Sequence, residues 1–152
     1  MGLKEKLTTA KPTTWPAEGI PEEEVRRIVE NVKSWKYIEA NIRLNDIAEL
    51  EDNWNGHGAK VFSEGLINRC RKILNELVEE PFIAPTAGGS IQFEYEKENG
   101  DYLEFEIFEN RIEMYSNTEE GGEIEDVWGG DDGVNWIKKA VEKFYGTKRE
   151  SE

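Results

Sequence analysis

The most constraining feature of this 152-residue chain is the alternation of apolar and charged residues in SIQFEYEKENGDYLEFEIFENRIEMYSN, residues 90–117. A period of two is typical of β-strands with one buried face. Asn99-Gly100 predicts a two-residue hairpin turn between the first two strands, and Asn110 marks a second turn. The predicted core-facing side chains are Ile91, Phe93 and Tyr95 on the first strand, Leu103, Phe105 and Ile107 on the second, and Ile112 and Met114 on the third. A fourth strand is expected around GEIEDVW, residues 122–128.

Apolar residues recur every three or four positions on both sides of this segment, which indicates helices. From Pro21 to Leu50, an apolar stripe that includes Ile28, Ile38 and Ile42 predicts either one long helix with an irregularity or two consecutive helices, with the stripe in the core. Another helix is predicted from an N-cap at Ser63 to about Glu79, and a C-terminal helix from a cap at Asp131 or Asp132. The predicted fold class is α+β, with an antiparallel sheet of three to four strands packed on two or three helices.

Composition suggests the domain organisation. Residues 1–20 contain prolines, threonines and little apolar periodicity, so they are predicted to form a flexible arm. Residues 21–146 are predicted to form a single α+β domain, and residues 147–152 a disordered tail. Trp15 lies between Pro12 and Pro16 in the arm. It either packs the arm against the domain or anchors a partner, and the sequence leaves both open.

The chain is strongly acidic, with 19 Lys and Arg against 33 Asp and Glu, a net charge of −14. This argues against direct binding of nucleic acid and for solubility or a basic partner. Cys70 is the single cysteine, and helical spacing predicts that it is a buried thiol instead of a nucleophile. Because there is no signal-peptide pattern and no apolar run of about 18 residues, the chain is expected to be cytoplasmic and not membrane-bound.

Most of the negative charge is concentrated in the predicted sheet. Residues 90–126 contain 13 acidic and two basic residues, a net charge of −11. If the strands pair as predicted, one sheet face carries Glu94, Glu96, Glu104, Glu106 and Glu113, and like charges on neighbouring strands are destabilising. Three explanations are open: a solvated face, a face that imitates phosphates for a basic partner, or a metal or acid–base site.

The loop DNWNGHGAK, residues 52–60, contains the only histidine of the chain. Gly56 and Gly58 indicate a turn, and Trp54 is expected to fill the gap between the flanking helices. A hydrolase or metal site could use Asp52 and His57. However, one histidine without a second histidine or a cysteine pair is poor material for a zinc site or a catalytic triad.

The motifs NWNGHGAKVFS, PFIAPTAGGSIQFEYE and GDYLEFEI resemble a family of small, mostly uncharacterised bacterial and mobile-element proteins. In that family a W-[DN]-G-x-G-A loop precedes a helix, and a P-x-I-x-P-T-x-x-G stretch leads into a strand. The similarity runs from Leu50 to Ile107. Asn55 and His57 stand where the family usually has Asp and Tyr, which weakens a chemical role for these two positions. The resemblance implies genes found in phages, plasmids and defence regions, and therefore an inhibitor or antitoxin role.

These observations favour a non-enzymatic inhibitor of anti-defence, anti-CRISPR or antitoxin type. Its acidic sheet face would occupy the basic, nucleic-acid-binding site of a partner such as a nuclease or toxin. The predicted partner-binding residues are Glu94, Glu96, Glu104, Glu106, Glu113, Trp54 and His57. No catalytic residue, cofactor or metal is predicted. The alternatives are a small hydrolase or metal-dependent enzyme that uses Asp52 and His57, and a structural or immunity module that meets its partner through Trp54 or Trp15.

Overall fold

The computed structural model describes residues 19–33, 35–130 and 132–146. Nearly all of the predicted arm, with Trp15, and the whole predicted tail lie outside these residues. The described part is α+β, as predicted, with four helices and five strands instead of two or three helices and three to four strands. In chain order these are α2 Glu22–Lys33, α3 Ile38–Ala48, α4 Glu64–Leu74, β1 Phe82–Pro85, β2 Ile91–Glu96, β3 Tyr102–Ile107, β4 Arg111–Thr118, β5 Gly122–Gly129 and α5 Val134–Tyr145.

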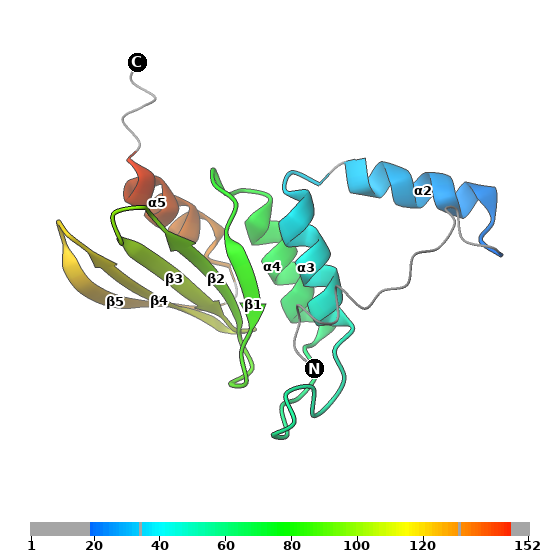
Figure 1. The fold of residues 1–152 in the computed structure, drawn as a ribbon, viewed down its shortest axis with the longest axis horizontal. Coiled ribbons are helices and arrows are strands. Elements are labelled where there is room, and N and C mark those ends of the chain that lie inside the picture. Colours follow the sequence, from blue (N-terminus) through cyan, green and yellow to red (C-terminus); the bar gives the residue numbers. More distant parts are fainter. Residues whose placement is uncertain (1–18, 34, 131, 147–152) are drawn as a thin grey trace, which may run out of the picture.

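The five strands form one antiparallel sheet in the order β1-β2-β3-β4-β5, so each strand pairs with its neighbour in sequence. Helix α5 packs against one face of this sheet, and α3 and α4 stand side by side near β1 (Figure 1). Short connections between successive strands account for this simple meander. The predicted fourth strand, residues 122–128, corresponds to β5.

Strand β1 is the strand that the sequence interpretation missed. Its segment is bounded by Pro81 and Pro85, and proline usually argues against a strand. In the structure β1 is the edge strand, where proline is tolerated because an outward-facing N–H is not needed for the ladder.

The first hairpin has a different turn from the predicted one. Lys97 and Asp101 form a hydrogen-bonded pair, and the Gly100 N–H donates to the Lys97 carbonyl over 2.9 Å. Gly100 has a φ of 95°, whereas Asn99 is not among the residues with positive φ. The connection is therefore a three-residue loop, residues 98–100, with a left-handed glycine, and the predicted two-residue turn is wrong.

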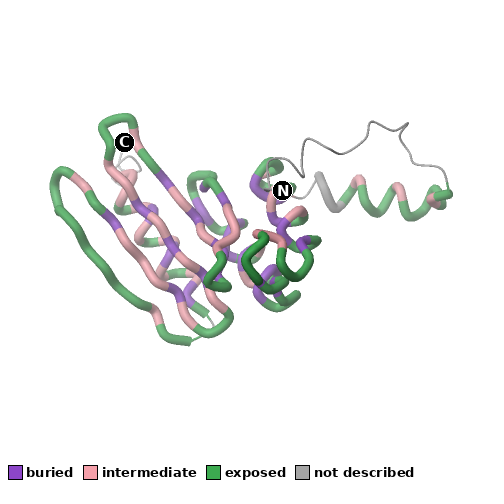
Figure 2. Tube along the Cα trace, turned by 60° about the horizontal axis from the view of Figure 1, so that its bottom comes forward, coloured by how far each residue is buried: buried purple, intermediate pink, exposed green. Residues whose placement is uncertain are grey.

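The predicted core of the sheet is confirmed. Phe93, Phe105, Ile107 and Ile112 are fully buried, and Met114 packs at the margin of the same cluster. From the helices, Ile137 and Val141 of α5 and Ile73 and Leu74 of α4 complete it. The alternation of buried and half-buried residues is visible along the central strands, whereas β5 is exposed along nearly its whole length (Figure 2).

The N-terminal apolar stripe lies only partly in the core. It forms two consecutive helices, and Leu44 and Ile47 of α3 are buried, but Ile28, Ile38 and Ile42 are exposed. Prediction of the whole stripe as core was therefore wrong. Helix α2, with Ile28, extends away from the sheet (Figure 1), and Ile38 and Ile42 lie on the exposed side of α3.

Two further helix boundaries differ from prediction. Ser63 caps α4 as predicted, since its Oγ accepts the Leu66 N–H over 3.0 Å, but α4 ends at Leu74, before the predicted end near Glu79. The N-cap of α5 is Gly133, with a φ of 92°, and not Asp131 or Asp132. A Cβ at position 133 would lie 2.8 Å from Ile112 Cδ1 and Trp128 Cδ1, so close packing requires glycine there.

Candidate interaction surface

The sheet face turned away from α5 carries a row of carboxylates on adjacent strands. Phe105 points toward α5, with its ring centroid 6.3 Å from that of Trp136. Because successive side chains of a strand point to opposite faces, Glu104 and Glu106 lie on the other side. We define the acidic face as the glutamates on this side of the sheet: Glu94, Glu96, Glu104, Glu106, Glu113, Glu123 and Glu125.

The register places like charges directly opposite each other at two points. Glu94 is the partner of Glu104, and Glu106 is the partner of Glu113. Lys97 and Asp101 form a hydrogen-bonded pair, so Glu94 and Glu104, three residues further along the ladder, form a non-hydrogen-bonded pair. Side chains approach most closely in such pairs, whose Cα atoms are about 4.5 Å apart. The register therefore produces the crowding that the alternation predicts.

Each of the four opposed carboxylates accepts one hydrogen bond from a neighbouring side chain. Gln92 Nε2 donates to Glu94 over 3.0 Å, and Tyr102 Oη donates to Glu104 over 2.6 Å. Ser90 Oγ donates to Glu106 over 3.1 Å. Three of the four donors are neutral, so they orient the carboxylates without cancelling their charge.

Arg111 is the exception. Its Nε lies 2.8 Å from Glu113 Oε2, and both side chains are more than two fifths exposed. An exposed ion pair of this kind contributes little to stability. Within the described residues it is the one ion pair on the acidic face, which therefore keeps a large net negative charge.

The pKa values of Tyr102 and Tyr115, which lie between the glutamates, are raised. Burial raises the pKa of Tyr102, and the hydrogen bond to Glu104 and the charges of Glu104, Glu94 and Glu96 raise it further. The pKa of Tyr115 is also raised, through desolvation and the charge of Glu123. Both hydroxyls therefore remain hydrogen-bond donors at neutral pH.

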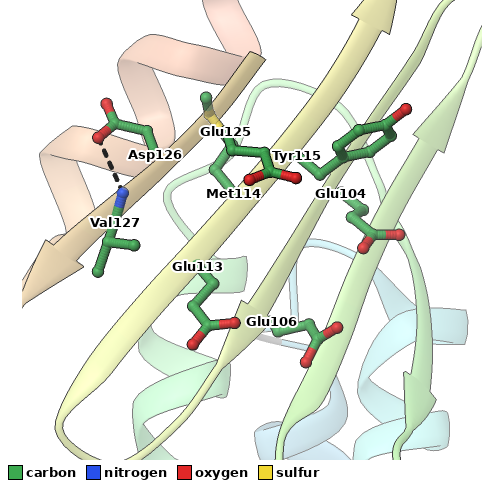
Figure 3. A pocket seen from close by; sticks show the side chains of 8 residues that line it. All are labelled: Glu104, Glu106, Glu113, Met114, Tyr115, Glu125, Asp126 and Val127. Atoms are coloured by element: carbon green, nitrogen blue, oxygen red, sulfur yellow. Dashed lines mark hydrogen bonds between the residues drawn. The ribbon is translucent and has the colours of Figure 1, made fainter. Parts of the chain in front are cut away.

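The acidic face contains a shallow hollow of about 330 Å³ between β3, β4 and β5. Figure 3 shows Glu106 and Glu113 side by side on neighbouring strands, with Glu104, Tyr115 and Glu125 above them. The hollow is open and is lined mainly by carboxylates, so its chemistry suits cationic groups.

The structure brings together the five glutamates predicted from the sequence, although Glu96 is exposed at the end of β2 and is paired with Tyr102 instead of a glutamate. The sequence interpretation missed Glu123 and Glu125 of β5, which lie opposite Asn117 and Tyr115. The alternation of Glu123, Glu125 and Val127 in GEIEDVW was the available signal, since it places these residues on one face.

The loop with Trp54 and His57 is separate from the acidic face, beside the ends of α3 and α4 (Figure 1). Trp54 packs on Phe62 with ring centroids 6.0 Å apart, and its Nε1 donates to the Lys60 carbonyl over 3.1 Å. The Trp54 ring is therefore partly buried and packs against the margin of the core, and its predicted place between the two helices stays a prediction.

Asp52 and His57 have different surroundings within this loop. Asp52 Oδ1 accepts the Val61 N–H over 3.0 Å, which closes the base of the loop. His57 is exposed, and its backbone N–H donates to Asn55 Oδ1 over 2.9 Å. The described residues show no interaction between the Asp52 carboxylate and the His57 ring. The geometry therefore gives no support to a catalytic pair here.

Other kinds of site were sought in the described part of the chain. No group of three or more His, Cys, Asp or Glu residues there is arranged to hold a metal ion. Cys70 is fully buried and its pKa is raised by desolvation, which fits the predicted inert thiol. None of the described helices combines the length and apolar character needed to cross a bilayer.

Comparisons with protein-family models, curated proteins and solved structures find no match to this chain. The resemblance to the mobile-element family therefore stays a prediction.

Proposed function

We propose that the protein is a non-enzymatic inhibitor whose acidic face binds the basic, nucleic-acid-binding surface of a partner protein. An anti-defence protein, such as an anti-CRISPR, or an antitoxin would act in this way. The carboxylates stand in for the phosphates that the partner surface normally binds. Occupation of that surface would exclude the nucleic acid by direct competition.

The observation that carries the proposal is the arrangement of the two opposed glutamate pairs. Like charges opposite each other reduce stability, and apolar or mixed-charge pairs would be more stable at these positions. The hydrogen bonds to Glu94, Glu104 and Glu106 come from uncharged side chains, so they fix the carboxylates in position but leave their charge available. Repulsion between these carboxylates lowers the stability of the free protein, and a bound cationic surface would offset this repulsion.

The spacing of the face also supports this proposal. Adjacent strands place carboxylates about 5 Å apart, and alternate residues along one strand are about 7 Å apart. Lysine and arginine side chains in a phosphate-binding groove could bind carboxylates at these intervals through charge-assisted hydrogen bonds. Long-range attraction between the two surfaces would also raise the association rate.

The test uses a face variant with Glu94, Glu104, Glu106 and Glu113 all changed to Gln. The matched control changes Glu22, Glu23, Glu24 and Glu30 of α2 to Gln, which removes the same charge elsewhere. Tagged protein is used to capture partners from native lysate at low salt. The Kd of each captured partner is then measured by calorimetry at two salt concentrations.

We expect the face variant to bind at least about 100-fold more weakly, a loss of about 2.7 kcal/mol, and the control variant to bind almost normally. High salt should weaken the wild-type complex. Equal Kd values for the face variant and the wild type would refute the proposal. A complex whose Kd does not change with salt would instead indicate an interface formed through Trp54 or Trp15.

A further inference from the structure

The two edges of the sheet differ in whether they can accept another strand. In an antiparallel ladder, residues alternate between those whose backbone groups point to the neighbouring strand and those whose groups point away. The Thr86 N–H donates to the Ser90 carbonyl. Counting back from Thr86 by twos, Ala84 and Phe82 face β2, so Ile83 and Pro85 of β1 face outward, as does Pro81, which directly precedes the strand.

The outward edge of β1 is closed. Proline has no N–H, so two of its three outward positions have no donor. The outward carbonyl of Ile83 accepts Arg43 Nε from α3 over 2.8 Å. Arg43 also stacks on Phe82, with its guanidinium carbon 4.3 Å from the ring centroid. Helix α3 and the two prolines together leave little backbone for another strand to pair with.

The outward edge of β5 is open. The Gly130 N–H donates to the Asn110 carbonyl, so the even-numbered residues of β5 face β4, and Glu123, Glu125, Val127 and Gly129 face outward. No described element pairs with this edge. Within the described part of the chain, one hydrogen bond covers part of this edge: Asp126 Oδ1 accepts the outward N–H of Val127 over 2.8 Å (Figure 3).

The side chains of β5 indicate what the edge could bind. Val127 is 58% exposed on the acidic face and Ile124 is 43% exposed on the opposite face, so each side of β5 offers an apolar contact. Glu123, Glu125 and Asp126 surround them with negative charge. Two β5 strands of separate copies would bring these acids together, which disfavours self-pairing.

We propose that β5 binds an extended, lysine- or arginine-rich segment of a partner protein as a sixth, antiparallel strand. Main-chain hydrogen bonds to Glu123, Glu125 and Gly129 supply the pairing, and the new strand takes over the Val127 N–H from Asp126. Basic residues lie opposite Glu123, Glu125 and Asp126, and apolar residues lie opposite Ile124 and Val127. This deepens the proposed function, on which it rests, because the added strand extends the acidic face to the partner.

The probe is the synthetic peptide Thr-Val-Lys-Lys-Ile-Lys-Thr with blocked ends. In antiparallel register its Val lies opposite Val127, its Ile opposite Ile124, and its three lysines opposite the three acids. The control peptide has the same sequence with N-methyl groups on Val and on the second and third lysines. These are the amides that would donate to β5, so the control keeps every side chain and charge but does not pair.

Amide hydrogen exchange of the full chain, followed by NMR, is the readout. At saturating peptide we expect exchange at Glu123, Glu125 and Val127 to slow at least about fivefold, with Ile83 on the closed edge unchanged. The N-methylated peptide should give no protection. Equal effects of both peptides would show charge attraction alone and would overturn the proposal. Protection without peptide that rises with protein concentration would identify a second copy as the occupant and would also overturn it.

This result is separable from the test of the proposed function. The face variant changes Glu94, Glu104, Glu106 and Glu113 but no residue of β5. If the face variant loses its partner while the peptide gives no protection, the acidic face acts without strand addition. If the peptide protects β5 while the face variant binds normally, the edge is an interaction site and the charge-mimicry function is wrong.

Discussion

Neutralising one member of each opposed glutamate pair should stabilise the protein. The change is Glu94→Gln combined with Glu106→Gln, which relieves both the Glu94–Glu104 and the Glu106–Glu113 contacts. The hydrogen bonds from Gln92 and Ser90 can persist in weaker form, because the oxygen of a glutamine side chain is also an acceptor.

The magnitude follows from Coulomb's law and the geometry of the ladder. Two unit charges about 5.5 Å apart in a medium like water repel by about 0.75 kcal/mol, so two pairs give about 1.5 kcal/mol. Screening reduces this to about 1.2 kcal/mol at 0.01 M salt and to about 0.2 kcal/mol at 1 M salt. The free energy of unfolding should rise by these amounts relative to the wild type.

Urea denaturation at both salt concentrations measures the effect. The matched control is Glu30→Gln with Glu98→Gln, which removes two charges from exposed positions. It should change the free energy of unfolding by less than about 0.5 kcal/mol. A gain in the double variant that is the same at both salt concentrations, or a loss at low salt, would refute the view that the opposed carboxylates repel each other.

Three further predictions concern the fold and the tyrosines. Gly133→Ala places a Cβ 2.8 Å from Ile112 Cδ1 at a φ of +92°. It should lower the free energy of unfolding by about 2–4 kcal/mol in urea denaturation. The control Gly129→Ala has open space around the new Cβ and should lower it by only about 0.5 kcal/mol. Arg69→Met removes the donor to the carbonyls of Phe108, Gly130 and Asp132. Because two of these bonds are exposed and water can replace them, stability should fall by about 1–2 kcal/mol, measured by thermal circular dichroism. Because the pKa of Tyr102 is raised above its ordinary 10.0, unfolded protein loses this proton first as pH rises. Stability should therefore fall above about pH 10, and Tyr102→Phe should make that fall shallower in denaturation curves collected across the alkaline range.

The sheet could be predicted from the sequence because its signal is local. The alternation around Phe93 and Phe105 fixes which side chains are buried, and both are fully buried in the structure. The position of the opposed glutamates follows from the same alternation once the strands pair. The turn at Gly100 was predicted to be two residues long, but the register requires three, and this register depends on how the whole strands pack.

The features that the sequence did not predict depend on tertiary neighbours. Strand β1 looks like a proline-bounded loop until α3 supplies Arg43 to its outward carbonyl. The exposure of Ile38 and Ile42 depends on where α2 and α3 end relative to the sheet, which periodicity does not specify. The sequence predicted the strand that contains Glu125. It did not predict that Glu125 belongs to the acidic face, because this depends on the register between β4 and β5.

The acidic face and the open edge of β5 meet at Glu125. This residue lies opposite Tyr115 on the face, and its backbone groups point to the open edge. A basic strand bound at that edge would place its own side chains next to Glu125, on the same surface as Glu104 and Glu113. One partner could therefore use main-chain pairing for affinity and the carboxylates for selection of a basic sequence. The opposed carboxylates and the unpaired edge of β5 then have one explanation. A cationic added strand would reduce the repulsion between the carboxylates and would pair the backbone groups of β5.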